Sequence, residues 1–373
     1  MAEKSVTYAR GEDQALIATT ARQYLEANIG IERVRELMMG EEGFERGLWK
    51  EMADLGWMGL AIAEEHGGAG LGPVELGVLL EEMGRLVTPG PFFASTVLAT
   101  TAIQEIGTDA QRADLLPGLA TGDMIATLAV FESPRSWAHR APEAVATPKG
   151  NGWALNGRKR AVLDGHLADT LLVTADAGDG VGVFVVDPGQ AGVDITQEPA
   201  LDPTRRMSTV ALDGVEGARL GDGDVSGALD RTMRLAATAL AAEQVGGAQR
   251  CMEMSVEYAK TRHQFGRPIG SYQAIKHRCA NMLMKVEHAR SAAYYAARVT
   301  DDAEELAVAA PLAASVASEA YVWVAGENIQ VHGGIGFTWE HDAHIYLKRA
   351  KASSLILGSP HHHRDLLGEA LGI

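Results

Sequence analysis

Three zones of hydrophobic patterning follow one another along the chain. Residues 12 to about 120 place apolar side chains at helical spacing, separated by breaks rich in glycine and proline. From about Ile125 the apolar residues come in short alternating runs bounded by Gly, Pro, Asn and Asp, which is typical of strands. After Val225 helical spacing returns and continues to the C-terminus. The pattern predicts helices, then a β sheet or barrel, then helices again.

This order predicts an α+β fold, mostly α, with more than one core, because 373 residues are too many for a single simple core. We expect an N-terminal helical domain over residues 1–121, a middle β-barrel over 122–225 and a C-terminal four-helix bundle over 226–373. Long helices joined by short breaks are what a bundle requires.

Composition and charge narrow the class of protein. The net charge of -16 argues against the basic face that nucleic-acid binding needs, so no nucleic-acid partner is expected. No apolar run stands out as long enough to span a bilayer, and we expect a soluble, cytoplasmic chain without membrane contact. Cys251 and Cys279 lie in helical patterns and predict reduced thiols. No metal is expected at His361–His363, because adjacent histidines point in different directions.

The stretch Tyr258–His277 predicts a polar corner between two helices. Gly266, Pro268 and Gly270 force a turn, and a second helix starts at Ser271. The corner carries side chains that can hold phosphate oxygens or lie against a flat ring: Arg262, Gln264, Phe265, Tyr272 and Gln273. The planar fork of an arginine suits a pyrophosphate. On spacing alone, an ordinary helix–helix turn is an equally open interpretation.

A second stretch, Glu327–Lys351, predicts a helix, a double glycine, an aromatic residue and a new helix. Gln330 is followed by Gly333 and Gly334, whose backbone amides become accessible to a ligand. As bare sequence, the same pattern also fits a helix C-cap.

Both stretches resemble the FAD-binding motifs of the acyl-CoA dehydrogenase family, R-x-Q-F-G-x-P-I-G-x-x-Q-x-x-K-H and Q-x-x-G-G-x-G-F. The resemblance covers essentially the whole chain. It implies that FAD is shared between subunits of a dimer of dimers, either a homotetramer or a heterotetramer. It also implies that one subunit contributes Arg262, Gln264, Phe265 and Gln273, and the next contributes Gln330, Gly333 and Gly334.

The reaction that the resemblance implies is α,β-dehydrogenation of an acyl-CoA thioester to the trans-2-enoyl-CoA. FAD performs the redox chemistry, a carboxylate removes the α proton, and an electron-transfer flavoprotein accepts the electrons. A buried glutamate would serve as the base, since burial raises the pKa of a carboxyl group.

The sequence departs from the family pattern at the base. The two positions at which the family carries its glutamate fall on Leu357 and Ala236. Glu243 lies two turns beyond Ala236, at the margin of an apolar stripe, and is our candidate for the base. The alternative is a helix-surface glutamate, or a structural one paired with Arg250.

A second departure concerns the flavin ring. The family's Trp and Thr/Ser beside the ring fall on Ala161 and Leu163, so only backbone amides near Phe131 and Val162 remain to contact it. The resemblance therefore leaves two rivals to a self-sufficient dehydrogenase. One is a non-catalytic subunit that completes the site of a related chain, as in two-subunit enzymes acting on sterol side-chain CoA esters. The other is an acyl-CoA oxidase or flavin monooxygenase.

Overall fold

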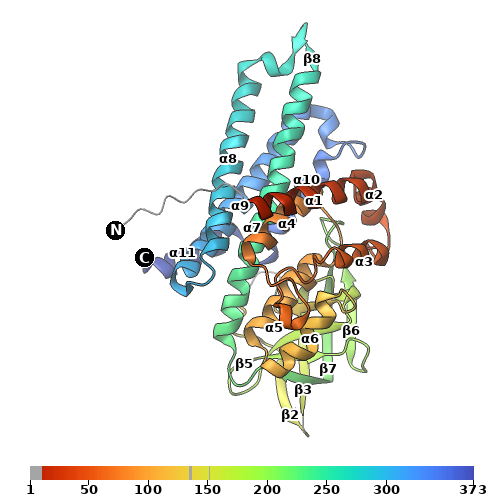
Figure 1. Cartoon of the computed structure of the whole chain (residues 1–373), viewed down its shortest axis with the longest axis vertical. Helices are drawn as coiled ribbons and strands as arrows, with labels where there is room; N and C mark the ends of the chain where they lie inside the picture. Colours follow the sequence, from red (N-terminus) through yellow and green to blue (C-terminus); the bar gives the residue numbers. More distant parts are fainter. Residues whose placement is uncertain (1–10, 134–136, 151) are drawn as a thin grey trace.

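The structure, a computed structural model, describes residues 11–133, 137–150 and 152–373. It is elongated, with the β8 turn at one end and the strands β2 and β3 at the other (Figure 1). The largest hydrophobic cluster contains residues of the N-terminal helices, the sheet and the C-terminal helices, so these parts share one continuous core.

The N-terminal part is helical, as predicted. Its elements are α1 (Glu12–Asn28), α2 (Ile31–Met39), α3 (Arg46–Asp54), η1 (Glu64–His66), α4 (Pro73–Arg85), η2 (Phe93–Ala99), α5 (Thr100–Ile106) and α6 (Asp109–Ala120). The start of α4 follows from its first residues. Pro73 occupies the first turn, and the Glu75 carboxylate accepts the backbone N–H of Gly72 at 3.2 Å, which together fix the helix end.

The middle part is a closed barrel with two added strands. Its strands are β1 (Ala126–Ala129), β2 (Val145–Lys149), β3 (Gly152–Leu163), β4 (Thr170–Asp176), β5 (Val181–Val186), β6 (Val193–Glu198) and β7 (Met207–Leu220), with the short helix η3 (Gly165–Leu167) after β3. The order β4-β2-β3-β7-β5 closes because β5 also pairs with β4, while β1 and β6 pair outside this circle. The predicted β-barrel is therefore confirmed.

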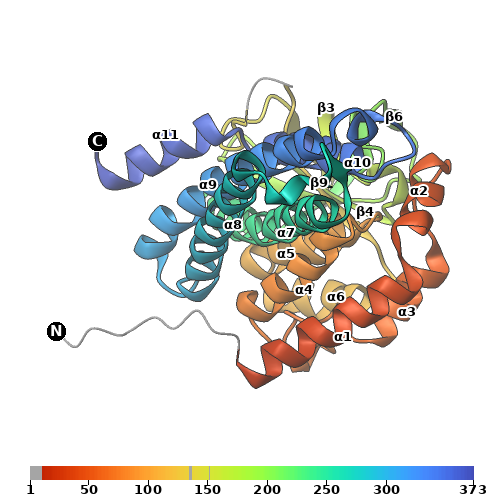
Figure 2. The ribbon, with the colours of Figure 1, turned by 90° about the horizontal axis from the view of Figure 1, so that it is seen from above.

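The C-terminal part is a helical bundle, as predicted, although it contains five helices where four were expected. It contains α7 (Ser226–Thr261), β8 (His263–Gln264), β9 (Arg267–Pro268), η4 (Ile269–Ser271), α8 (Gln273–Arg298), α9 (Ala303–His332), η5 (Gly333–Phe337), α10 (Ala343–Ile356) and α11 (Pro360–Leu371). Gly358, with φ +130°, and Pro360 separate α11 from α10. Figure 2 shows α11 reaching outward on one side of the molecule, opposite α2 and α3.

Helix α9 departs from one expectation of the sequence analysis. Together with η5 it forms one segment, Ala303–Phe337, that is long and apolar enough by length and composition to cross a membrane, although no such run stood out in the sequence. Within its most apolar window, 61% is buried inside the protein. Alanine and valine dominate its surface because α9 is the central helix of the bundle and packs against α7, α8, α10 and α11.

Helices α4 and α7 approach each other more closely than side chains allow. A Cβ atom on Gly246 would lie 1.8 Å from the backbone oxygen of Glu81, and one on Gly84 would lie 2.0 Å from that of Glu243. Real Cβ atoms do not tolerate such contacts. The two glycines therefore set the distance between the N-terminal domain and the bundle.

We predict that Gly246→Ala lowers the free energy of unfolding by about 3 kcal/mol or more, because the added methyl group forces the two helices apart. Urea denaturation followed by circular dichroism measures this change. Gly227→Ala, at an open position on the same helix, is the control and should be neutral or stabilising by up to about 1 kcal/mol. Equal effects of the two substitutions would contradict the close approach.

Candidate functional site

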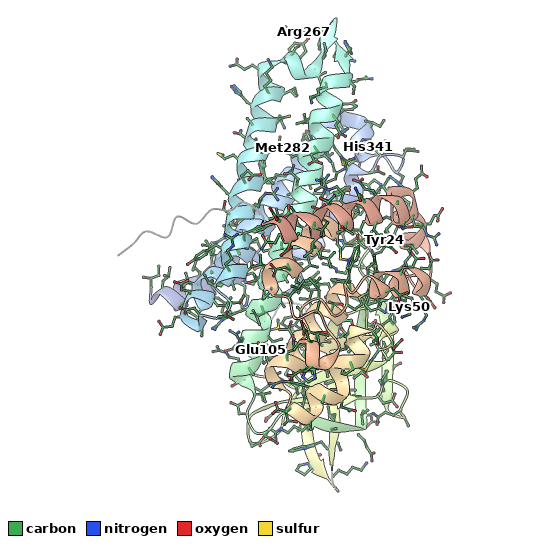
Figure 3. The ribbon with its side chains drawn as sticks, in the orientation of Figure 1. Tyr24, Lys50, Glu105, Arg267, Met282 and His341 are labelled. Atoms are coloured by element: carbon green, nitrogen blue, oxygen red, sulfur yellow. The ribbon has the colours of Figure 1, made fainter. Side chains whose placement is uncertain are left out.

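The first predicted motif lies at the tip of the long bundle. Helix α7 ends at Thr261, and the chain turns back through the β8–β9 pair before α8 begins (Figure 1). Phe265 and Gly266 make this turn with φ of +54° and +80°. Figure 3 places Arg267 at the outermost point of the molecule. The predicted helix–turn–helix corner is thus present, with a two-residue hairpin at its apex.

The tip presents its functional groups outward. Phe265 is 92% exposed, and the side chains of Arg262, Gln264 and Gln273 form no hydrogen bond with the part of the chain that the structure describes. The hairpin itself is held in shape, because the Tyr272 hydroxyl donates to the Gln264 carbonyl at 3.1 Å. Free polar groups around an exposed aromatic ring fit the dinucleotide part of FAD.

The second predicted motif lies beside the first, on the same part of the bundle. Helix α9 ends at His332 and is followed by Gly333, which has φ +66°; the His332 ring lies 4.4 Å from the ring of Tyr258 on α7. Gln330, Gly333 and Gly334 are exposed there. These three residues face solvent, as contact with a ligand held by another chain requires.

Glu243 lies in a different environment from the one predicted. It is 6% exposed, and both carboxylate oxygens are engaged: Oε2 accepts from Arg205 at 2.5 Å and Oε1 from Arg349 at 3.2 Å. The predicted structural partner, Arg250, instead faces Glu253 and Glu257. Both carboxylate oxygens therefore already accept charge-assisted hydrogen bonds, which compete with a role as a base. The assignment of Glu243 as the base stays a prediction, and this geometry favours a structural role.

The same ion pairs connect all three parts of the chain. Arg349 on α10 also lies 3.0 Å from Asp202 of the β domain and donates to the carbonyls of Val87 and Thr88 in the N-terminal domain, each at 3.1 Å. Buried charges of this kind are stable only when each is paired and hydrogen-bonded. We call the group formed by Asp202, Arg205, Glu243 and Arg349 the junction cluster.

Asp164 lies next to the junction cluster and is itself buried. It has φ +50° and is 2% exposed. Burial raises the pKa of its carboxyl group, the charges of Arg205 and Arg349 oppose this only in part, and the resulting pKa is about 6. Its ionised form is therefore held at a cost in free energy at neutral pH.

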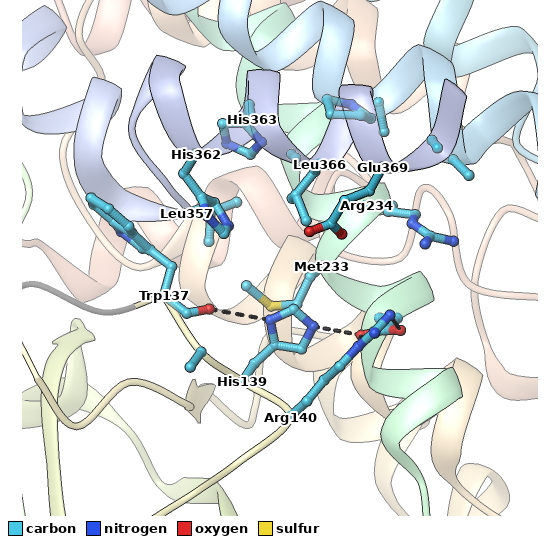
Figure 4. A pocket seen from close by; sticks show the side chains of 17 residues that line it. Trp137, His139, Arg140, Met233, Arg234, Leu357, His362, His363, Leu366 and Glu369 are labelled. Atoms are coloured by element: carbon cyan, nitrogen blue, oxygen red, sulfur yellow. Dashed lines mark hydrogen bonds and ion pairs between the residues drawn. The ribbon is translucent and has the colours of Figure 1, made fainter. Parts of the chain in front are cut away.

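A cavity of about 480 Å³ lies at the other end of α7, between α7, α9, α11 and the segment 137–140 (Figure 4). Leu357 faces it from the end of α10. Across the cavity, His139 Nε2 lies 2.6 Å from Asp230 Oδ1, and Arg140 also pairs with Asp230. Although burial raises the pKa of Asp230, its hydrogen bonds to His139 and Arg140 lower it to about 2.

Sequence reasoning missed this cavity. His139 and Asp230 are 91 residues apart in sequence, so no local pattern connects them. The histidine run His361–His363 begins α11, and His362 and His363 line the cavity. Burial lowers the pKa of His363 to about 4, with the neighbouring His362 adding to the effect.

The position expected for the flavin ring is nearly filled. Only about 20 Å³ remains between the walls of this position, about the size of one water molecule. The side chains around it are all apolar: Leu98, Leu128, Val130, Phe131, Ala161, Leu163, Met233, Ile356 and Leu357. A space of this size cannot enclose a flat tricyclic ring, and its walls offer the ring no polar side chain. The residues of this chain thus fit the dinucleotide part of FAD and do not fit its ring.

Comparison with known proteins matches two family models, the acyl-CoA dehydrogenase N-terminal domain over residues 11–123 and the C-terminal domain over residues 227–372. The acyl-CoA dehydrogenase IpdE2 of Mycolicibacterium smegmatis is 36% identical over 94% of this chain and 96% of its own length.

Two solved structures are similar over nearly the whole chain. A variant of the Tcur3481-Tcur3483 steroid ACAD has a TM-score of 0.90 at 35% identity, covering 98% of this chain and 99% of the other. The ChsE4-ChsE5 complex from Mycobacterium tuberculosis has a TM-score of 0.90 at 29% identity with the same coverage.

We predict that Asp164→Asn raises the free energy of unfolding by about 1–3 kcal/mol at pH 7–8, because it removes a carboxylate whose ionised form is disfavoured by burial. The folded-state pKa is raised, so the destabilisation is full above pH 6 and disappears as pH falls from 6 towards 4. Denaturation across this pH range measures the gain.

Asparagine also tolerates the left-handed backbone conformation of residue 164. The exposed Asp194→Asn is the control and should change the free energy of unfolding by less than about 0.5 kcal/mol. A gain for Asp164→Asn that persists unchanged at pH 4 would contradict the raised pKa.

Proposed function

The chain belongs to the acyl-CoA dehydrogenase family of FAD-dependent oxidoreductases, and we propose that it works as one of two different subunits of a heteromeric acyl-CoA dehydrogenase. The observation that carries the proposal is the contrast between the two ends of α7. The tip presents an intact, exposed dinucleotide corner, whereas the flavin-ring position at the opposite end is nearly filled. One chain therefore carries half of a working cofactor site.

The proposed role of the tip is to hold FAD whose ring lies in the partner subunit. Arg262 would pair with the pyrophosphate, Gln264 and Gln273 would donate hydrogen bonds, and Phe265 would lie against a flat ring. The second motif, Gln330 with Gly333 and Gly334, would contact FAD from the neighbouring subunit. FAD, when bound, supplies the acceptor for the hydride.

The length of α7 supports this division. Its 36 residues extend about 54 Å at 1.5 Å per residue, so the tip and the flavin-ring position of one chain are far apart. A second chain must bring a ring position to each tip. The heteromeric arrangement also explains why Leu357 stands where the family carries its base, since a partner that holds the flavin ring also supplies the base.

Exposed apolar side chains support an assembly of several chains. Phe265, Phe337 and Trp339 are 92%, 78% and 61% exposed, and all three belong to the two cofactor motifs or follow them directly. Large exposed apolar groups that cluster in this way mark interaction sites. We propose a dimer of dimers, built as a heterotetramer.

The proposed reaction is α,β-dehydrogenation of an acyl-CoA thioester to the trans-2-enoyl-CoA, with electrons passed to an electron-transfer flavoprotein. Similarity to a steroid enzyme supports a sterol side-chain CoA ester as the substrate. A cytoplasmic location is part of the proposal, because the apolar helix α9 lies within the bundle.

A second candidate function is a self-sufficient dehydrogenase with Glu243 as its base. Its support is that Glu243 is a buried carboxylate on α7, the helix that also lines the cavity. Catalysis by Glu243 requires that its ion pairs with Arg205 and Arg349 open. An oxidase or monooxygenase is the further alternative, and oxygen consumption by the reduced protein would identify it.

The first experiment is the visible spectrum and solution mass of the chain purified alone and together with its native partner. We expect a colourless protein alone and a yellow heterotetramer with one FAD for every two chains. A yellow homotetramer with one FAD per chain would contradict the two-subunit proposal and support the second candidate.

Within the heterotetramer, Arg262→Ala should weaken FAD binding about 10- to 100-fold, the scale of losing charge-assisted hydrogen bonds. Lys260→Ala is the matched control. It removes one exposed positive charge just before the tip and should leave FAD affinity within about 2-fold. Equal losses for both variants would show that general charge, and not the corner, holds the cofactor.

We predict that Glu243→Gln lowers the free energy of unfolding by about 3–5 kcal/mol, because it leaves Arg205 and Arg349 without their buried counter-ion. The exposed Glu257→Gln on the same helix is the control and should be neutral. In the heterotetramer, the Glu243→Gln substitution should leave the rate at which bound flavin is reduced, measured by stopped-flow absorbance, unchanged. A stable Glu243→Gln variant that reduces flavin roughly 10²-fold more slowly would instead identify Glu243 as the base.

A further inference from the structure

We propose that His332 and His341 form a pH-sensitive contact that holds the loop between α9 and α10 closed, and that acid opens this loop and releases FAD. The packed rings of Tyr258, His332 and His341 are called the ring cluster below. The release of FAD rests on the proposed function, because the loop carries the second cofactor motif. The opening itself rests on contacts within this chain.

The ring cluster closes the loop that connects α9 to α10. His332 is the last residue of α9, and His341 lies shortly before α10 begins (Figure 3). The His332 ring contacts two others, with its centroid 4.4 Å from that of Tyr258 on α7 and 4.3 Å from that of His341. Gly333 and Gly334 follow His332 directly, so a movement of this ring is passed to the second cofactor motif.

Hydrogen bonds assign the proton that each imidazole carries. His332 Nδ1 lies 2.8 Å from the carbonyl oxygen of Asn328, which only accepts, so this nitrogen carries a hydrogen. His341 Nδ1 accepts the backbone N–H of Ala343 at 3.1 Å, so this nitrogen keeps a free electron pair. That N–H lies in the first turn of α10 and has no partner within the helix. Protonation of neutral His341 must occur at Nδ1, and it therefore breaks the hydrogen bond at the start of α10.

The surroundings of both rings disfavour the protonated form. Burial lowers the pKa of His332, the hydrogen bond to Asn328 opposes this in part, and the charge of His341 lowers the pKa further. Burial also lowers the pKa of His341, with Asp342 opposing this effect and Arg35 adding to it. If both rings are protonated, two positive charges repel each other with their ring centroids 4.3 Å apart.

The charged groups around the loop add to this preference. Asp342, the acidic group beside the ring cluster, already accepts from Arg35 of α2 at 2.6 Å, and Arg35 also donates to the Trp339 carbonyl at 2.6 Å. Glu340 is exposed to solvent. On α10, the Lys348 ammonium lies 4.0 Å from the centre of the Trp339 ring. Acid therefore adds positive charge to a loop that two cations already contact.

The lowered pKa values give the sign of the pH effect. A histidine whose pKa is lowered in the closed loop takes up a proton more readily once the loop has opened. The closed form is therefore fully favoured above the ordinary histidine pKa of about 6.5 and becomes progressively less favoured as the pH falls below it. Burial also lowers the pKa of His344, but this ring packs against Trp339, with centroids 4.8 Å apart, outside the ring cluster.

The test is hydrogen–deuterium exchange of the full-length chain at pH 7.5 and pH 5.5, followed by mass spectrometry. Unstructured peptides exchanged under the same conditions correct for the intrinsic pH dependence of exchange. We expect the backbone amides of residues 333–345 to lose protection about 10-fold or more at pH 5.5, because opening takes up protons. Amides of β7 are the internal control and should change by less than about 2-fold. Unchanged protection of residues 333–345 would overturn the proposal.

Two variants each remove one titrating ring and keep one of its contacts. His341→Asn retains a side-chain oxygen that can accept the N–H of Ala343, and His332→Phe retains an aromatic ring against Tyr258. Neither new side chain gains a proton in acid, so each should reduce the loss of protection at pH 5.5 at least about 3-fold. His361→Asn is the matched control, because 80% of this side chain is exposed on α11, and it should respond as the unmodified chain does.

Thermal melting at pH 7.5 confirms that each variant is folded. An acid response of the same size in the unmodified chain, His341→Asn and His332→Phe would overturn the assignment to these two rings.

The heterotetramer tests the consequence for FAD, followed by the rise in flavin fluorescence on release. We expect FAD affinity to fall about 10-fold or more between pH 7.5 and pH 5.5, and to fall less in His341→Asn. FAD that stays equally bound at pH 5.5 while residues 333–345 lose protection would overturn its link to the loop. A heterotetramer without FAD at pH 7.5 would overturn the proposed function, and exchange of the chain alone would still decide whether acid opens the loop.

Discussion

The structure depends on the pairing of buried charges in the junction cluster. Arg205 and Arg349 are almost fully buried, and each needs an anionic partner and satisfied hydrogen bonds to be tolerated there. Glu243 and Asp202 supply the charge, and two backbone carbonyls of the N-terminal domain accept hydrogen bonds from Arg349. Because these groups come from all three parts of the chain, the cluster fixes how helices, barrel and bundle meet.

Local sequence patterns predict most of the fold. Hydrophobic periodicity distinguishes the helices of the two ends from the strands between them. The polar corner Tyr258–His277 can be recognised in the sequence because its residues are contiguous. Barrel closure was harder to predict, since the parallel pairing of β2 with β4 and the pairing of β3 with β7 join strands that are far apart in the sequence. The separation of α11 from α10 depends on Gly358 and Pro360, both visible in the sequence, although nothing there shows that His363 turns inward.

The candidate site was less predictable, for a physical reason. Helical spacing placed Glu243 near the apolar stripe of α7 but could not show what faces it, because Arg205 and Arg349 lie 38 and 106 residues away in sequence. The same limit hid the contact between His139 and Asp230. Long-range contacts between charged groups leave no periodic signal, so only the folded chain reveals which carboxylate is free and which is already engaged.

The separation of the two ends of α7 has an evolutionary consequence. In the proposed assembly each end of α7 serves a different cofactor site, so a substitution at Leu357 or Ala161 would spare the site to which the same chain's tip contributes. After a gene duplication, two copies can then divide the work: one keeps the ring position and the other keeps the tip. Selection then acts on the pair of chains and not on either chain alone.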